Sequence, residues 1–173
     1  MSRPAVRVHV LEGEARFADD AGTCLTAVLG SCVAACLFDR VAEVGGMNHF
    51  LLAGGDGREA GSSRRYGAYL MEVLINGLLE RGASRARLEA KLFGGASLWS
   101  GGADIGPANV AFAERFLADE GIPLVGGSLG GTQGRRVEYW PATGRARQLL
   151  VGAPAPKPAP PKVMEDAGHV EFF

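Results

Sequence analysis

The run CVAACLFD, residues 32–39, constrains the fold more than any other part of the chain. From Cys32 to Phe38 every residue is apolar, so the strand that this run predicts must be covered on both faces. Gly30 and Ser31, just before it, mark a break between this strand and an earlier one that begins at Cys24. Residues 24–38 therefore predict two strands joined by a tight turn.

Periodic patterns elsewhere predict a mixture of strands and helices. Apolar residues at helical spacing over 66–78 and 106–121 predict two helices, and Pro107 and Gly121 suit the first turn and the end of the second. The polar residues 59–65 are expected to be a loop. Further strands are expected over residues 6–17, 44–55, 87–93 and 122–131, with a hairpin over 135–151.

The composition changes after Val151. Residues 152–162 are rich in proline and alanine, a composition that keeps a linker extended. The chain is therefore expected to divide into one domain over residues 1–151 and a C-terminal linker and peptide over 152–173 that is disordered. A length of 173 residues and a hydrophobic content of 47% suit one domain with a real core.

Charge and composition exclude several classes of function. The net charge is -1, so the chain lacks the basic footprint of a nucleic-acid-binding protein. It has no run of about 18 apolar residues and no apolar signal core at its start, so we expect a cytoplasmic protein that is not inserted in a membrane. The cysteines have no CxxC spacing and the histidines are scattered, so no disulfide framework, metal site or other cofactor is expected.

Three cysteines, Cys24, Cys32 and Cys36, raise the question of a thiol nucleophile. Such a nucleophile needs a base that makes the thiolate and donors that bind the developing oxyanion. Cys32 follows Gly30 and Ser31, where the chain can turn tightly and main-chain N–H groups can converge. A free cysteine in an apolar run is most often a small core residue, and position alone leaves that alternative open.

His49 is the best candidate for the base, because it lies among apolar residues of a predicted core strand. That strand follows the Cys32 strand after a short connection, so the two are expected to be antiparallel neighbours. The alternative for His49 is a hydrogen-bonded core histidine. His9 is expected to face solvent on the first strand, and His169 lies in the C-terminal peptide.

Two glycine-rich stretches, KLFGGAS at 91–97 and GGTQGRR at 130–136, are expected to border an active-site cleft. GGTQGRR lacks the Lys-Ser/Thr ending of a phosphate-binding loop and a following helix, so nucleotide binding is rejected. Arg135 and Arg136 are interpreted as charges at a strand edge, with docking of acidic helices as the alternative.

Several stretches occur in the order in which one known family has them. They are LTAVLGSCVAACLFD (25–39), GGMNHFLL (45–52), RYG (65–67), KLFGGAS (91–97), IGPANV (105–110) and GGTQGRRVEY (130–139). Together they resemble the CheD family, the chemoreceptor glutamine deamidases of bacterial chemotaxis. The resemblance implies an α+β fold of mixed β-sheets packed together with flanking helices, similar to the catalytic domain of cytotoxic necrotizing factor toxins.

The resemblance also implies a catalytic triad of cysteine, histidine and threonine. The family's Gly-Ser-Cys motif falls on Cys32, its Met-x-His motif on His49, and its threonine on Thr26. Thr26 would hold the His49 ring through its hydroxyl or main-chain oxygen, as the third member of a triad does. Main-chain N–H groups near Gly30, Ser31 and Cys32 are expected to bind the oxyanion.

The activity that the resemblance implies is that of a protein-glutamine glutaminase. It would convert glutamines of methyl-accepting chemotaxis receptors to glutamate through a thioester, with release of ammonia. The implied partners are these receptors and a CheC-type phosphatase, and we expect a monomer. Two alternatives stay open: a binding module for the receptor or the phosphatase without catalysis, and a receptor glutamyl methylesterase that uses the same thioester route.

Overall fold

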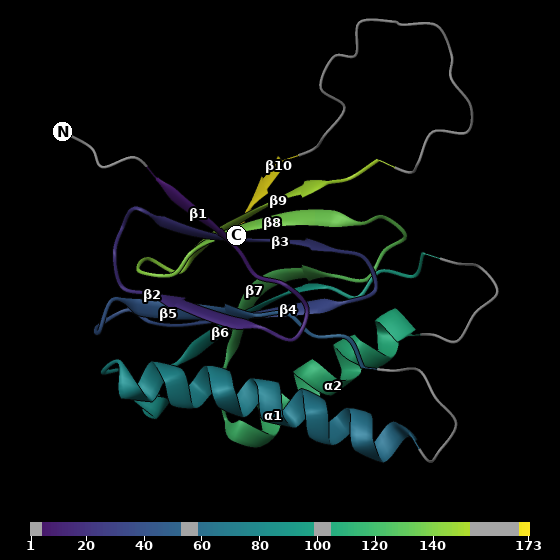
Figure 1. The fold of residues 1–173 in the computed structure, drawn as a ribbon, viewed down its shortest axis with the longest axis horizontal. Helices are drawn as coiled ribbons and strands as arrows, with labels where there is room; N and C mark the ends of the chain where they lie inside the picture. The colour runs from purple at the N-terminus through teal and green to yellow at the C-terminus, as the bar shows by residue number, and fades with distance from the viewer. Residues whose placement is uncertain (1–4, 53–58, 99–104, 153–169) are drawn as a thin grey trace, which may run out of the picture.

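Two β-sheets pack face to face in the computed structural model, which describes residues 5–52, 59–98, 105–152 and 170–173 (Figure 1). Sheet A contains, in spatial order, β1 (Val6–His9), β3 (Thr23–Leu29), β8 (Arg135–Trp140), β9 (Arg145–Leu150) and β10 (Val170–Phe172). Sheet B contains β2 (Ala15–Ala18), β5 (Val44–Asn48), β4 (Val33–Asp39), β6 (Glu89–Gly94) and β7 (Leu124–Leu129). A short 3-10 helix, η1, spans Arg85–Arg87.

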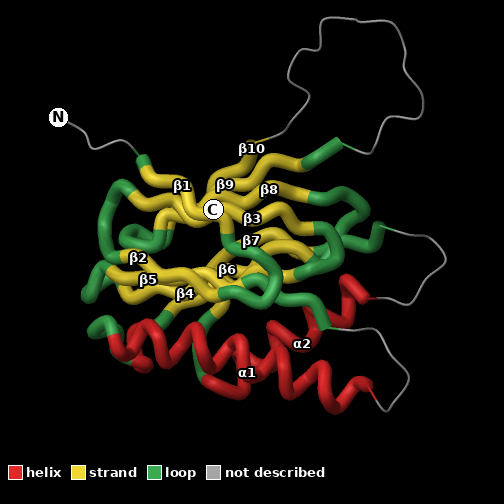
Figure 2. Tube along the Cα trace, viewed as in Figure 1, coloured by secondary structure: helices red, strands yellow, loops and turns green. Residues whose placement is uncertain are grey.

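The helices α1 (Glu59–Glu80) and α2 (Ile105–Glu120) cover the outer face of sheet B (Figures 1 and 2). Each sheet combines one parallel pair with antiparallel pairs: β1 runs parallel to β3, and β6 runs parallel to β7. The expected α+β fold of mixed, packed sheets with flanking helices is therefore confirmed.

Strand β4 is buried along its whole length, as its apolar run predicts. Val33, Ala35 and Leu37 belong to the core between sheet B and the helices. Ala34 and Cys36 belong to a second core between the two sheets. β4 is thus the strand that both layers cover, and its neighbours in the sheet are β5 and β6.

The pairing of β4 with β5 brings the two candidate catalytic segments together. The strands are antiparallel, as predicted, with Cys36 opposite Met47, and a separate bridge pairs Val33 with Phe50. Both pairs follow one register. His49 therefore lies opposite Ala34 and one diagonal step from Cys32, a relation for which the typical Cα separation is about 7–8 Å.

Two expectations from periodicity were wrong. The strand predicted over 6–17 is two strands, β1 in sheet A and β2 in sheet B, with a turn between them at Gly13, whose φ is +86°. The loop predicted over 59–65 is the beginning of α1. A helix adds residues more easily than it starts, so the apolar stripe further along α1 is enough to support these polar residues as helix.

The end of the C-terminal peptide forms a strand at the edge of sheet A. β10 pairs with the edge of β9, with Glu171 opposite Gln148. The rings of Phe173 and Phe93 pack edge to face, with their centroids 5.5 Å apart, next to the core between the sheets. The rest of the predicted linker, residues 153–169, lies outside the described residues, and the domain boundary near Val151 stays a prediction.

Candidate functional site

Cys32 lies in the connection between β3 and β4, half-buried against the core between the sheets. Its carbonyl accepts a hydrogen bond of 2.8 Å from the N–H of Gly95. Gly94 has a φ of +107°, and a Cβ at this position would lie 2.1 Å from the Cys32 carbonyl oxygen. Gly94 of KLFGGAS is thus required because it packs directly on the main chain of the candidate nucleophile.

The two carbonyls before Cys32 are also fixed. The Gly30 carbonyl accepts from the N–H of Ala96 at 2.9 Å, and the Ser31 carbonyl accepts from Nδ2 of Asn109 at 2.8 Å. In a trans peptide the N–H points away from the carbonyl of the same unit. The N–H groups of Ser31 and Cys32 therefore point away from these partners.

Only Cys32 among the three thiols is partly exposed, whereas Cys24 and Cys36 are buried. Burial raises the pKa of the Cys32 thiol, the charge of Glu12 raises it further, and the main-chain N–H of Cys32 opposes both. Burial also raises the pKa values of Cys24 and Cys36. The resting Cys32 thiol is therefore protonated at neutral pH and needs a base.

His49 is buried and faces the core between the sheets, because its neighbours Asn48 and Phe50 point to the helix side. Its Nδ1 lies 3.0 Å from the carbonyl oxygen of Val10. Since a carbonyl only accepts, Nδ1 must carry the proton, and Nε2 of the neutral ring has a lone pair. Nε2 is buried and has no hydrogen-bond partner among the described residues.

Thr26 does not hold the ring in the way predicted. Its hydroxyl is hydrogen-bonded to Nδ1 of His9 at 2.9 Å, and its carbonyl accepts from the N–H of Val10 at 2.8 Å. The group that holds His49 is the Val10 carbonyl, so Thr26 is one residue removed from the ring. Sequence reasoning missed Val10, because a main-chain carbonyl leaves no signature in the residue type.

Two buried asparagines were also missed. Oδ1 of Asn48 accepts from the N–H of Ala35, which ties the strand of His49 to that of Cys32. Asn109, on α2, donates to the Ser31 carbonyl and accepts from the N–H of Leu52 at 3.0 Å. The motif IGPANV contains Asn109 and was part of the resemblance, but nothing in the sequence assigns a role to this residue.

The two glycine-rich stretches lie side by side. Gly130 donates its N–H to the Gly94 carbonyl, and Ser97 donates its N–H to the Gly131 carbonyl, both at 2.9 Å. A hollow of about 400 Å³ between them and α2 is lined by residues that include Gly95, whose N–H holds the Cys32 carbonyl. This arrangement supports the expectation that both stretches border the site.

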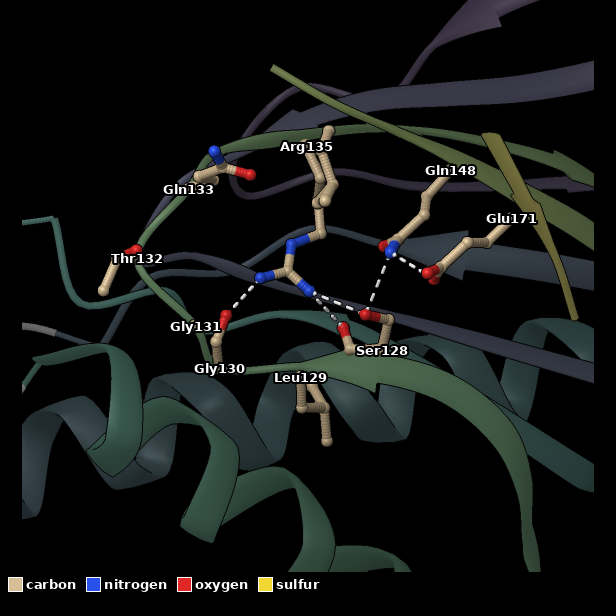
Figure 3. Close-up of a pocket in the computed structure, with 10 residues that line it drawn as sticks. Ser128, Leu129, Gly130, Gly131, Thr132, Gln133, Arg135, Gln148 and Glu171 are labelled. Atoms are coloured by element: carbon tan, nitrogen blue, oxygen red, sulfur yellow. Dashed lines mark hydrogen bonds between the residues drawn. The ribbon is translucent and has the colours of Figure 1, made fainter. Parts of the chain in front are cut away.

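Arg135 is not the strand-edge charge that was predicted, because only 3% of it is exposed. Its guanidinium donates to the carbonyl and hydroxyl of Ser128 and to the carbonyl of Gly130 (Figure 3). It lines a pocket of about 320 Å³ together with Gln148 and Glu171, and neither Cys32 nor His49 lines that pocket. The guanidinium thus braces the turn between β7 and β8.

Among the described residues, no group of three or more His, Cys, Asp or Glu side chains could hold a metal ion. No helix within the described ranges is long and apolar enough to cross a membrane.

A half-buried thiol, a histidine with an unpartnered ring nitrogen on the same face of a sheet, and adjacent main-chain donors are the parts of a thiol acyl-transfer site. The family model described as CheD chemotactic sensory transduction matches residues 51–148. The chain belongs to the CheD family.

Relatives match over nearly the full chain. A protein named probable chemoreceptor glutamine deamidase CheD, from Caulobacter vibrioides, is 57% identical over 98% of this chain and 94% of its own length. A protein of the same name from Agrobacterium fabrum is 50% identical over 100% of this chain and 99% of its own. The solved structure of Neisseria meningitidis protein NMB0706 covers 68% of this chain and 53% of its own at 17% identity, with a TM-score of 0.43. That likeness is too distant to bear on fold or function.

Proposed function

We propose that this chain is a protein-glutamine glutaminase that deamidates glutamine side chains of methyl-accepting chemotaxis receptors. The names of relatives at 50–57% identity support the substrate class. The observation that carries the chemistry is the buried Nε2 of His49, which has no partner among the described residues. A buried acceptor without a partner costs about 1–3 kcal/mol, and the Cys32 thiol is the proton donor that would use it.

In the proposed reaction, Nε2 of His49 takes the proton of the Cys32 thiol while Sγ attacks the carboxamide carbon of the substrate. The N–H groups of Ser31 and Cys32 stabilise the oxyanion of the tetrahedral intermediate. His49 then gives the proton to the leaving nitrogen, the C–N bond breaks, and ammonia leaves a thioester on Cys32. Water, deprotonated by His49, attacks the thioester carbon, so that glutamate leaves and the thiol is restored.

The Val10 carbonyl would be the third member of this triad. A carbonyl orients the ring and fixes its tautomer, and it stabilises an imidazolium less than a carboxylate does. Thr26 would act through Val10, since its carbonyl bonds the Val10 N–H. The proposed catalytic residues are therefore Cys32 and His49, with Val10 and Thr26 in support.

The resemblance to the CheD family also supports a CheC-type phosphatase as a regulatory partner. Such a protein would compete with receptors for the surface around Cys32. We propose that residues 1–151 form the catalytic domain and work as a monomer in the cytoplasm, where the signalling region of the receptors lies.

The experiment that tests the proposal is incubation of the full chain with the cytoplasmic fragment of a methyl-accepting receptor. Mass spectrometry of the fragment should reveal conversion of glutamine to glutamate by the wild-type chain and none by Cys32→Ala. Equal conversion by Cys32→Ala would reject the mechanism. Conversion only of a fragment that carries glutamyl methyl esters would favour the esterase, and no conversion of either fragment would favour the binding module.

A further inference from the structure

The amide of Asn109 bonds to both catalytic segments at once. Its Nδ2 donates to the carbonyl of Ser31, the residue before Cys32, at 2.8 Å. Its Oδ1 accepts from the N–H of Leu52, on the segment that follows His49, at 3.0 Å. The partners are a carbonyl and an N–H, so they fix which end of the amide is oxygen.

The position of Asn109 is itself tightly set. The residue is fully buried on α2. One turn earlier, Gly106 packs so closely on the segment after β6 that a Cβ there would lie 2.4 Å from the Ala96 carbonyl oxygen. The close approach at Gly106 therefore fixes the position from which α2 presents the Asn109 amide to Ser31.

The bond to Ser31 controls one peptide unit, the one that contains the Cys32 N–H. Because the unit is planar and trans, holding its carbonyl toward α2 directs the N–H to the opposite side. The nitrogen of that N–H is separated from Sγ by only three bonds within Cys32, so the N–H lies near the sulfur, and it lowers the pKa of the thiol. A donor beside the sulfur is where the oxyanion forms when a carboxamide is attacked.

We propose that Asn109 is a positioning residue that orients the Ser31–Cys32 peptide so that the Cys32 N–H binds the oxyanion. This inference rests on the proposed thioester mechanism. It assigns to Asn109 an effect on the transition state of acyl transfer that is separate from any effect on the thiol and its base.

The test compares two reactions of the same thiol. Deamidation of the receptor fragment forms an oxyanion, whereas alkylation of Cys32 by iodoacetamide displaces iodide and forms none. For Asn109→Ala we expect the kcat of deamidation to fall about 10- to 100-fold, with KM within about 3-fold, because one donor is misdirected. The alkylation rate of Cys32 should stay within about 2-fold of wild type.

A second variant, Asn109→Asp, tests the same proposal if Asn109→Ala folds poorly. In Asn109→Asp a protonated carboxyl can still donate to the Ser31 carbonyl, whereas an ionised one repels it. The ratio of its kcat to that of wild type should therefore rise as the pH falls from about 8.5 to 6, the range in which a buried carboxyl can titrate.

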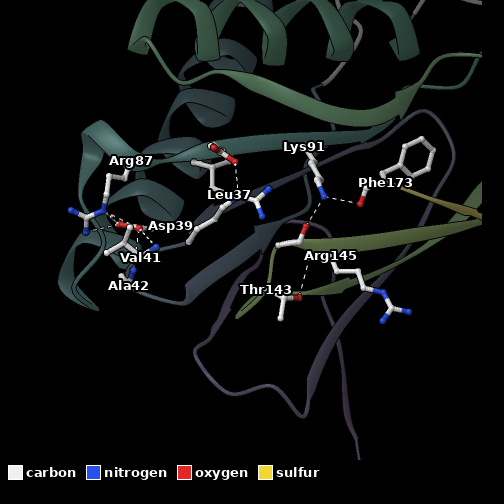
Figure 4. A network of polar contacts seen from close by, with 12 residues as sticks. Leu37, Asp39, Val41, Ala42, Arg87, Lys91, Thr143, Arg145 and Phe173 are labelled. Carbon is white, nitrogen blue, oxygen red and sulfur yellow. Dashed lines mark hydrogen bonds and ion pairs between the residues drawn. The ribbon is translucent and has the colours of Figure 1, made fainter.

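The matched control is Asp39→Asn, which removes a buried charge at the other end of β4 (Figure 4). It should lower the melting temperature and leave both reactions of Cys32 unchanged. Equal losses of deamidation and alkylation in Asn109→Ala would overturn the proposal, as would an unchanged kcat or a flat pH ratio for Asn109→Asp. Failure of the thioester mechanism itself would be distinct, because Cys32→Ala would then deamidate the fragment as wild type does.

Discussion

The buried polar groups at the two ends of strand β4 differ in whether they have hydrogen-bond partners. At the C-terminal end, Asp39 is fully satisfied: its carboxylate accepts from the guanidinium of Arg87 and from the N–H groups of Ser84, Val41 and Ala42, at 2.8 to 3.1 Å (Figure 4). At the N-terminal end, the Nε2 of His49, a residue that lies opposite Ala34, is also buried and has no partner among the described residues.

The difference separates a stabilising cluster from a reactive one. Burial alone would raise the pKa of Asp39, but the hydrogen bonds from Arg87 and the three N–H groups outweigh it, and the pKa lies well below its ordinary value. The hydrogen bonds that the Asp39 carboxylate accepts all stabilise the fold. Nε2 of His49, in contrast, keeps a lone pair that can take a proton during the reaction, at the cost in stability of a buried acceptor without a partner.

The largest expected effect is the loss of activity on substitution of His49, whose Nε2 has no hydrogen-bond partner among the described residues. His49→Gln removes the ring nitrogen that takes the thiol proton, and general-base catalysis contributes about 10²- to 10⁴-fold, so we expect kcat/KM for the receptor fragment to fall about 1000-fold. The thermal midpoint should change little. A variant that keeps more than about a tenth of wild-type activity would place the base elsewhere.

Substitution of Asp39, at the C-terminal end of β4, should lower the stability of the fold and leave activity unchanged. Asp39→Ala leaves Arg87 and several N–H groups without their acceptor, and we expect a loss of about 2 kcal/mol in the free energy of unfolding at pH 7, since Arg87 is half-exposed. Chemical denaturation measures this loss, and kcat of the folded variant should match wild type.

The same loss should depend on pH in one direction. The pKa of Asp39 is lowered on folding, so its contribution to stability is fully present well above the unfolded value of about 3.9 and is lost as the pH falls from there through the lower pKa of the folded chain. The difference in unfolding free energy between wild type and Asp39→Ala should therefore shrink steadily as the pH falls from about 5 to about 2. A gap that stays constant to low pH would mean that the charge of Asp39 is not what stabilises the cluster.

Cys36 lies between the two ends of β4, and like Cys32 it contacts the core between the sheets. It is fully buried, and Cys36→Ala should cost about 1 kcal/mol of stability through lost packing. Deamidation should remain within about 2-fold of wild type, because this thiol is fully buried from substrate and burial raises its pKa far above the ordinary value. A large loss of kcat in a well-folded Cys36→Ala variant would contradict the assignment of Cys36 to packing alone.

The smallest expected effect concerns Glu12, an exposed residue. Burial is the main cause of the raised pKa of Cys32, and the charge of Glu12 is the second. Glu12→Gln removes that charge, lowers the thiol pKa and increases the thiolate fraction. The rate of Cys32 alkylation at about pH 8 should therefore rise about 2- to 3-fold, with the gain smaller at high salt. A slower reaction would mean that Glu12 assists the thiol instead of opposing it.

The sequence was sufficient for the parts of the fold that depend on periodicity and turns. The apolar run at 32–38 predicted a strand covered on both faces, and its short connection to the next strand predicted the antiparallel pair that carries Cys32 and His49. The hairpin over 135–151 was also predicted correctly, as β8 and β9.

What the sequence did not contain were interactions made by main-chain atoms across long separations. Val10 acts on His49 through a carbonyl, and any residue type supplies one. Asn109 meets Ser31 only once α2 has packed on sheet B. Likewise, the docking of Glu171 opposite Gln148 depends on an open sheet edge, which no local pattern at the C-terminus reveals.

The most direct test of the central claim is carbamidomethylation of the full chain by iodoacetamide, with the modified cysteine located by mass spectrometry and deamidation measured at each stage. Activity should fall in proportion to the fraction of Cys32 modified, while the buried Cys24 and Cys36 stay unmodified in the folded chain. Full deamidation of the receptor fragment by protein in which Cys32 is completely carbamidomethylated would contradict the account.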